Sequence, residues 1–122
     1  MARSRASAKA AGSSFERLIA DGLAEALGDD RIDRRVKSGA KDRGDIGGVR
    51  VHGQRVVIEC KDVAVQALPQ WTREAQLEAG NDDALVGLVV AKRRGTRDPM
   101  SQWVHMEVRD LVALLTGEVQ AR

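Results

Sequence analysis

The sequence predicts a mixed α/β domain in which a central mixed β-sheet is flanked by helices. Three observations lead to this prediction. Residues 14–27 and 67–80 carry apolar residues at helical spacing, the segment between them contains β-prone runs of a hairpin, and residues 85–91 form a continuous apolar run. The resulting order of elements is α, β, β, β, α, β, then β and α. That mixture favours one sheet with helices packed on it.

The first helix is expected at residues 14–27. Ser13 and Glu16 fit a capping box, in which each side chain hydrogen-bonds the backbone of the other residue. One apolar stripe follows at helical spacing: Phe15, Leu18, Ile19, Gly22, Leu23, Ala26 and Leu27. Gly28 is a typical helix stop. Residues 1–12 are small and basic without periodicity, so we expect a flexible basic N-terminal arm and a single domain at 13–122.

The remaining elements follow in order along the chain. We expect a short strand near 32–37, a basic glycine-containing loop, and then the hairpin DIGGVRV, HGQ, RVVIECK. The second helix covers 67–80, with Pro69 in its first turn. Residues 85–91 predict a strand buried on both faces. A strand at 103–106 and a helix at 108–115 complete the domain, and both tryptophans, Trp71 and Trp103, are expected in the core.

The composition fits one folded, soluble domain. The chain has 122 residues, of which 43% are hydrophobic and 31% charged. No apolar run approaches the roughly 20 residues that cross a bilayer, and the N-terminus has no apolar segment of a secretory signal. The single cysteine, Cys60, excludes an internal disulfide and favours the cytoplasm. No motif indicates a zinc site, a small-molecule cofactor or a membrane partner.

The basic residues are clustered although the net charge is only +2. Residues 31–43 contain six basic residues against two acidic ones, and a second cluster follows the apolar run at 85–91. Such clusters are typical of a polyanion-binding surface, whereas the alternative is a set of solvated loops. The candidate nucleic-acid contacts are Arg34, Arg35, Lys37, Lys41, Arg43, Lys92, Arg93 and Arg94.

The last strand of the hairpin is expected to be buried, but charged residues lie at its end. Side chains alternate across a strand, so Glu59 and Lys61 share one face. If residues 52–54 form a three-residue turn, Asp45 lies opposite Lys61, and the three charged side chains converge. A two-residue turn at 53–54 places Asp45 on the other face, because a one-residue slip reverses the pattern. A bulge in the glycine pair after Asp45 restores the convergence.

Two carboxylates and an ammonium group are suited to phosphodiester chemistry. Carboxylate oxygens suit Mg²⁺, which keeps several waters and is often completed by a substrate phosphate. A neighbouring lysine orients or deprotonates a water, or stabilises charge on the phosphate. This set predicts metal-assisted phosphodiester hydrolysis. The alternatives are a turn role for Asp45 and an exposed ion pair between Glu59 and Lys61.

These residues also resemble a known signature. Asp45, followed after thirteen residues by Glu59-Cys60-Lys61 at the end of an apolar strand, resembles the D…E-x-K motif of the PD-(D/E)XK nuclease superfamily over residues 13–91. Within it, Glu16, the Lys37-Ser38-Gly39 loop and the hairpin look most like small archaeal and phage Holliday junction resolvases. Gly44 departs from the pattern, which has a proline before the aspartate.

The resemblance implies a restriction-endonuclease-like αβββαβ core and a role for each matching residue. Asp45, Glu59, the Cys60 backbone carbonyl and Glu16 are implied as ligands of Mg²⁺, for which Mn²⁺ would substitute. Lys61 is implied as the catalytic lysine, and Ser38 approaches the scissile phosphate. Glu16 keeps its alternative role in the capping box, and Gln76 is a weak match to a polar residue on the second helix.

We therefore expect an Mg²⁺-dependent, structure-specific endodeoxyribonuclease that cuts branched DNA in recombination or repair. A symmetric junction cut at two points favours a homodimer. The expected location is the cytoplasm, or the host cytoplasm if the gene belongs to a phage. The alternatives are a nuclease of the same superfamily acting on flaps, ends or single strands, and a catalytically inactive nucleic-acid-binding module.

Overall fold

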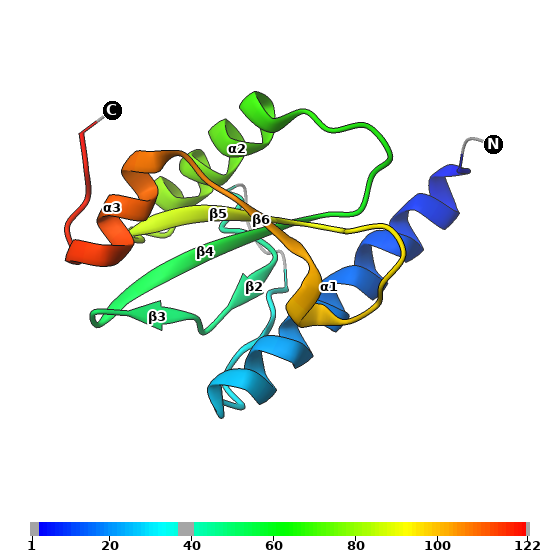
Figure 1. Ribbon diagram of the computed structural model, residues 1–122, viewed down its shortest axis with the longest axis horizontal. Coiled ribbons are helices and arrows are strands. Elements are labelled where there is room, and N and C mark those ends of the chain that lie inside the picture. The colour runs from blue at the N-terminus through cyan, green and yellow to red at the C-terminus, as the bar shows by residue number, and fades with distance from the viewer. Residues whose placement is uncertain (1–2, 37–40, 122) are drawn as a thin grey trace.

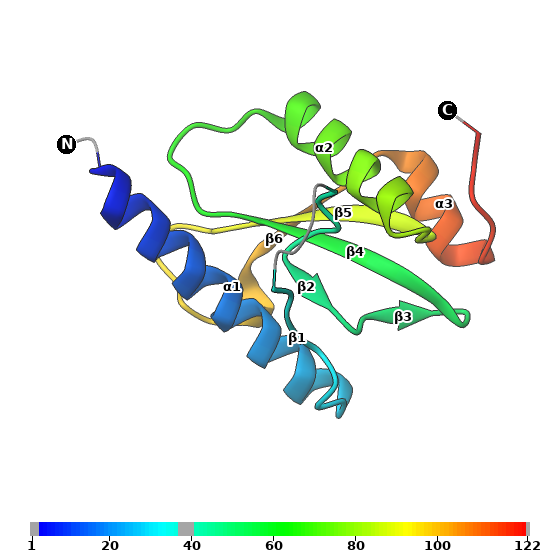
Figure 2. The same cartoon turned by 180° about the vertical axis from the view of Figure 1, so that it is seen from behind.

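The computed structural model describes residues 3–36 and 41–121, and it has a mixed sheet with helices on both faces (Figures 1 and 2). The strands are β1 Asp33–Arg34, β2 Ile46–Gly47, β3 Arg50–Val51, β4 Gln54–Lys61, β5 Val86–Ala91 and β6 Trp103–His105. The helices are α1 Arg5–Leu27, α2 Leu68–Asn81 and α3 Val108–Thr116, with a short 3₁₀ turn, η1 Pro99–Ser101. The predicted mixed sheet flanked by helices is confirmed.

The sheet order is β1-β2-β4-β5-β6, and β3 pairs with β4 beyond β2. β4 and β5 are parallel and are connected through α2, whereas every other recorded pair is antiparallel. The strands and helices expected from the sequence are all present among the described residues, and the final helix ends at Gly117 as predicted. No helix within residues 3–36 and 41–121 has the length and apolar character needed to cross a membrane.

The start of α1 differs from the prediction. The helix begins at Arg5, and the Oγ of Ser4 caps it by accepting a hydrogen bond from the backbone N–H of Ser7 at 3.1 Å. Residues 5–12 are therefore helical and not an arm, and Ser13 lies inside the helix, where it caps nothing. The reason is composition, because this segment is rich in alanine, which has the highest helix propensity without needing an apolar stripe. The end of the helix at Gly28 agrees with the prediction.

The hairpin turn has two residues, like one of the two predicted versions, but it lies one residue earlier in the chain. His52 and Gly53, both with positive φ, form a two-residue turn, so Val51 pairs with Gln54. β2 follows a different register, with Ile46 opposite Ile58. The change occurs at Gly48, whose φ of 89° is one that glycine adopts readily. This change of register is a β-bulge, and it returns the side chain of Asp45 to the face on which the three-residue turn had placed it.

This register changes the expected partner of Asp45. Because Ile46 pairs with Ile58, the antiparallel pairing places Asp45 opposite Glu59 instead of Lys61. The backbone N–H of Asp45 donates to the carbonyl of Ile58 at 2.9 Å, which holds this position against β4. Asp45 still shares a face with Glu59 and Lys61, so the predicted convergence of the two carboxyl groups is kept.

Two hydrophobic clusters lie on opposite faces of the sheet. The larger one joins α1 and α3 to the sheet through Phe15, Ile19, Ile46, Val56, Ile58, Val86, Val90 and Ala113. The smaller one lies under α2 and contains Trp71, Ala75, Val89 and Ala91. β4 alternates between them, so its residues Val57, Glu59 and Lys61 face α2.

α2 lies unusually close to β5. A Cβ atom built on Gly87 would overlap the carbonyl oxygen of Ala75, so only glycine allows this approach. Trp71, on the face of α2 that packs on the sheet, is buried at 5% exposure, as predicted. Trp103 is 47% exposed, and its expected place in the core is wrong. β6 is the edge strand of the sheet in residues 3–36 and 41–121, so Trp103 has a neighbouring strand on one side only.

Candidate active site

Asp45 and Glu59 form a buried carboxyl pair between β2 and β4. Their side chains belong to residues that are only 3% and 7% exposed. Asp45 Oδ2 accepts a hydrogen bond from the backbone N–H of Cys60 at 2.8 Å. Burial and then the neighbouring charge of Glu59 raise the pKa of Asp45 to about 7. Burial and then the neighbouring Glu78 raise the pKa of Glu59 to about 9.

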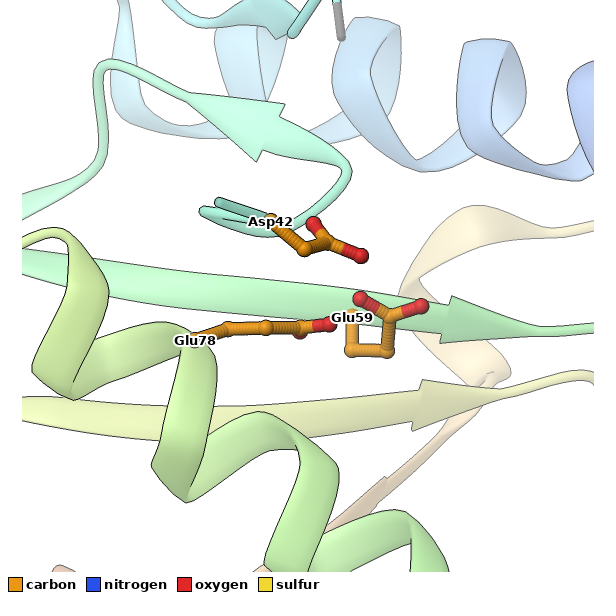
Figure 3. Close-up of side chains that lie close together, drawn as sticks. All are labelled: Asp42, Glu59 and Glu78. Atoms are coloured by element: carbon orange, nitrogen blue, oxygen red, sulfur yellow. The ribbon is translucent and has the colours of Figure 1, made fainter. Parts of the chain in front are cut away.

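A third buried carboxyl group reaches this pair from α2. Figure 3 shows the side chains of Glu78, Glu59 and Asp42 pointing toward one another from the helix, from β4 and from the loop before β2. One carboxylate oxygen from each of the three lies within 4.8 Å of the others. Glu78 is 5% exposed, and burial, followed by the charges of Asp42 and Asp45, raises its pKa to about 7.

Two oxygen atoms of this cluster have no hydrogen-bond donor. Glu59 Oε2 and Glu78 Oε1 are buried, and no N–H or O–H group of the described residues reaches them. A buried carboxylate oxygen without a donor costs several kcal/mol. A shared proton or a bound cation removes that cost. The cluster is therefore chemically suited to a hard divalent cation with oxygen ligands.

Local contacts hold the loop of Asp42 against the end of α2. The backbone N–H of Gly44 donates to Asp42 Oδ1 at 2.9 Å, which is a typical aspartate turn. Asn81 Nδ2, at the last residue of α2, donates to the backbone carbonyl of Asp42 at 2.8 Å. The same helix therefore carries Glu78 and anchors the loop that supplies Asp42.

Lys61 is the cation next to the cluster. Its Nζ lies 3.0 Å from Glu74 Oε2 and 4.0 Å from Glu59 Oε1. Burial by itself lowers the lysine pKa, but the hydrogen bond from Lys61 to Glu74 and the charge of Glu59 outweigh it, and the net shift is upward. Lys61 is therefore held as an ammonium ion at neutral pH.

Glu16 lies beside the cluster and not within it. Its Oε1 accepts hydrogen bonds from Arg34 Nε and Nη2 at 3.2 and 3.1 Å. Its charge contributes to the raised pKa of Asp45. The predicted ligand role of Glu16 therefore competes with its ion pair to Arg34.

Cys60 itself is not an activated nucleophile. Burial, and then the negative charge of Asp45, raise the pKa of its thiol above the ordinary value. Gln76 also has a role away from the site, because its Nε2 donates to Glu107 Oε1 at the start of α3. The weak match of Gln76 to a site residue therefore has no support in its contacts.

Most of the predicted basic residues adjoin residues of the site in the chain or in the sheet. Lys41 and Arg43 are exposed next to Asp42, and Lys92, Arg93 and Arg94 follow β5. Arg35 instead forms two hydrogen bonds to Asp82, at 3.1 and 3.2 Å, and is largely occupied by that partner. Lys37 and Ser38 lie outside the described residues.

Three residues of the site, Asp42, Glu74 and Glu78, were not predicted. Glu78 had a sequence signal, because it lies three and seven positions after Ala75 and Trp71 on the buried stripe of α2. A carboxylate on an apolar helical stripe indicates either a partner or a function. Asp42 had no such signal, since KDRGD is an ordinary polar turn sequence.

No protein-family model, curated protein or solved structure matches this chain. The geometry of the site and the sequence pattern are therefore the basis for a functional proposal.

Proposed function

We propose that the protein is an Mg²⁺-dependent endodeoxyribonuclease with a restriction-endonuclease-like core. The observation that carries this proposal is the buried group of Asp45, Glu59 and Glu78, with two donor-less oxygens, next to the ammonium of Lys61. A protein gains no stability from burying several carboxyl groups together, so such a cluster indicates function.

The arrangement of strands supports the proposed core. The aspartate and the glutamate come from neighbouring antiparallel strands, β2 and β4, and the lysine follows two residues later on the same face. β4 continues through α2 into the parallel strand β5. This is the order expected from the D…E-x-K resemblance, and α2 adds Glu78 to the acidic group.

Asp42, Asp45, Glu59 and Glu78 are the residues that would hold Mg²⁺, with the Cys60 carbonyl as a further oxygen. Bound Mg²⁺ supplies a Lewis acid for the phosphate and lowers the pKa of a coordinated water. The donor-less oxygens of Glu59 and Glu78 fit this role, because a cation replaces the missing donors. The all-oxygen donor set suits Mg²⁺ or Mn²⁺ and not a thiol-seeking metal.

Lys61 acts as a fixed positive charge. Because its pKa is raised, it does not serve as the general base. Its ammonium group instead stabilises negative charge that develops on the phosphate in the transition state. Glu74, whose side chain is 37% exposed, holds Lys61 in place through the 3.0 Å ion pair.

DNA is the proposed substrate because clustered cations adjoin residues of the site. Lys41 and Arg43 neighbour Asp42 in the chain, and the run 92–94 begins beside Lys61, whose carbonyl accepts a hydrogen bond from the backbone N–H of Lys92 at 2.9 Å. These side chains contact phosphates, which position a nucleic acid without reading its sequence. Phosphate contacts of this kind fit a structure-specific enzyme acting on branched DNA. A homodimer would supply the two active sites that a symmetric junction needs.

A cleavage assay tests the proposal. A labelled four-way junction, a flap and a plain duplex of matched sequence are incubated with the protein and Mg²⁺ or EDTA. The wild type cuts branched DNA only with the metal, and Asp45→Asn and Lys61→Met reduce the rate by roughly 100-fold or more. The exposed Asp30→Asn serves as the matched control and retains full activity. Metal-independent cutting, or full activity in both site variants, overturns the proposal.

A further inference from the structure

A cleft opens beside Lys61 on the face of the sheet that carries α2. The strand registers place Lys61, Ala91 and Trp103 side by side on β4, β5 and β6. Because alanine is small, the space between the lysine and the tryptophan remains open. The cleft has a volume of about 370 Å³, which is within the range of small-ligand sites.

The walls of this cleft, named here the tryptophan cleft, are aromatic and cationic. Trp103 is 47% exposed, and the guanidinium carbon of Arg93 lies 4.6 Å from the centre of its ring. Trp71 forms a second aromatic wall from α2. The remaining lining includes Lys92 and Arg94. An exposed indole next to arginines is an unfavourable surface in water but a good platform for another flat ring.

The cleft continues into a second basic depression. This neighbouring space has a volume of about 500 Å³ and shares Lys92 and Arg94 with the tryptophan cleft. Arg3, at the start of the chain, lies across from them and pairs with Asp62 at 3.3 Å. A chain of phosphates can therefore follow the cations away from Lys61 while a ring occupies the space next to Trp103.

We propose that the tryptophan cleft binds an unpaired nucleobase of the strand that is cut, next to the scissile phosphate. This inference rests on the proposed nuclease function and specifies its substrate. A base inside a continuous duplex has both faces covered by its neighbours, so it cannot stack on Trp103. A base in a single strand, a flap or a branch point is free to do so. The protein therefore acts where the substrate strand is unpaired, and it discriminates against continuous duplex.

Fluorescence provides a test that does not depend on cleavage. The variant Trp71→Phe leaves Trp103 as the only tryptophan of the chain. A single-stranded oligodeoxynucleotide is titrated in EDTA, next to an abasic oligonucleotide of equal length and a duplex. Quenching that saturates with the normal strand, and at least tenfold weaker binding of the abasic strand, is the expected result. Equal quenching by the normal and abasic strands overturns the inference. If Trp71→Phe does not fold, the same titration is made on the wild type against Trp103→Phe.

Binding and cleavage by Trp103 variants complete the test. Trp103→Ala weakens single-strand binding by roughly tenfold, and Trp103→Phe retains most of it, because a phenyl ring also stacks. Val104→Ala, on the opposite face of β6, is the control and leaves binding unchanged. If the wild type cuts DNA and Trp103→Ala binds and cuts equally well, the cleft has no such role and the nuclease proposal stands. If base-dependent quenching occurs without any cleavage, the cleft stands and the nuclease proposal fails.

Discussion

Replacing Glu59 by glutamine should reverse its effect on stability between acidic and alkaline pH in the metal-free protein. The folded chain raises the pKa of Glu59 from 4.5 to about 9. Below about pH 4.5 the group is protonated in both the folded and the unfolded chain. Between the two pKa values only the folded chain keeps the proton, so the free energy of unfolding falls as the pH rises.

The size of the effect follows from the width of this window. Within this window each pH unit lowers the free energy of unfolding by about 1.4 kcal/mol. At about pH 8 the ionisation of Glu59 in the unfolded chain has therefore lowered the free energy of unfolding of the wild type by at most about 5 kcal/mol. Glutamine has no such loss, but its buried amide oxygen still lacks a donor, which costs about 1–3 kcal/mol. Glu59→Gln should therefore be less stable than the wild type by about 1 kcal/mol near pH 5 and more stable by about 2 kcal/mol near pH 8.

Urea unfolding in EDTA at the two pH values measures this difference directly. The exposed Glu118→Gln is the matched control and should change stability little at either pH. A Glu59→Gln variant that is destabilised by the same amount at both pH values would show that Glu59 is ionised and solvated. The reasoning about the buried cluster would then be wrong.

Three further predictions follow from the site and its support. Near pH 8, millimolar Mg²⁺ should raise the melting temperature of the wild type in a thermal-shift assay, but not the melting temperature of Glu78→Gln. An equal rise in both proteins excludes Glu78 as a ligand. Gly87→Ala should lower the free energy of unfolding in urea by about 3 kcal/mol, because the added Cβ overlaps the backbone of α2. Gly80→Ala, which has open space around it, is the control and should not lower the free energy of unfolding. Equal effects of the two substitutions would contradict the close approach of α2 to β5. Replacing Lys92, Arg93 and Arg94 together by alanine should make the logarithm of the DNA-binding constant fall less steeply with the logarithm of the salt concentration. The change in slope should correspond to the loss of up to about three phosphate contacts, and an unchanged slope excludes these residues from the interface.

Much of the fold was visible in the sequence because local patterns determine it. The apolar stripe of α1, the buried run of β5 and the glycine stops at 28 and 117 each act within a few residues. The alternation of β4 likewise placed Glu59 and Lys61 on one face. The start of α1 was missed because alanine-rich segments extend a helix without an apolar signal.

The missing part of the site depends on tertiary packing. Glu78 joins Glu59 only because Gly87 lets α2 lie directly on β5, and no local pattern encodes that distance. The partner of Asp45 depends on a single bulge at Gly48, which shifts the register by changing one φ angle. The exposure of Trp103 depends on β6 being the edge strand, which is a property of the whole sheet.

Calorimetric titration with Mg²⁺, and with Mn²⁺ in parallel, tests the metal centre most directly. At about pH 7 the protein is titrated in two buffers with different ionisation enthalpies, which gives the number of protons released on binding. Because the pKa values of Asp45, Glu59 and Glu78 are raised in the metal-free protein, we predict saturable binding that releases about one proton or more. Binding without proton release, binding unchanged in Glu59→Gln, or no binding of either metal would contradict it.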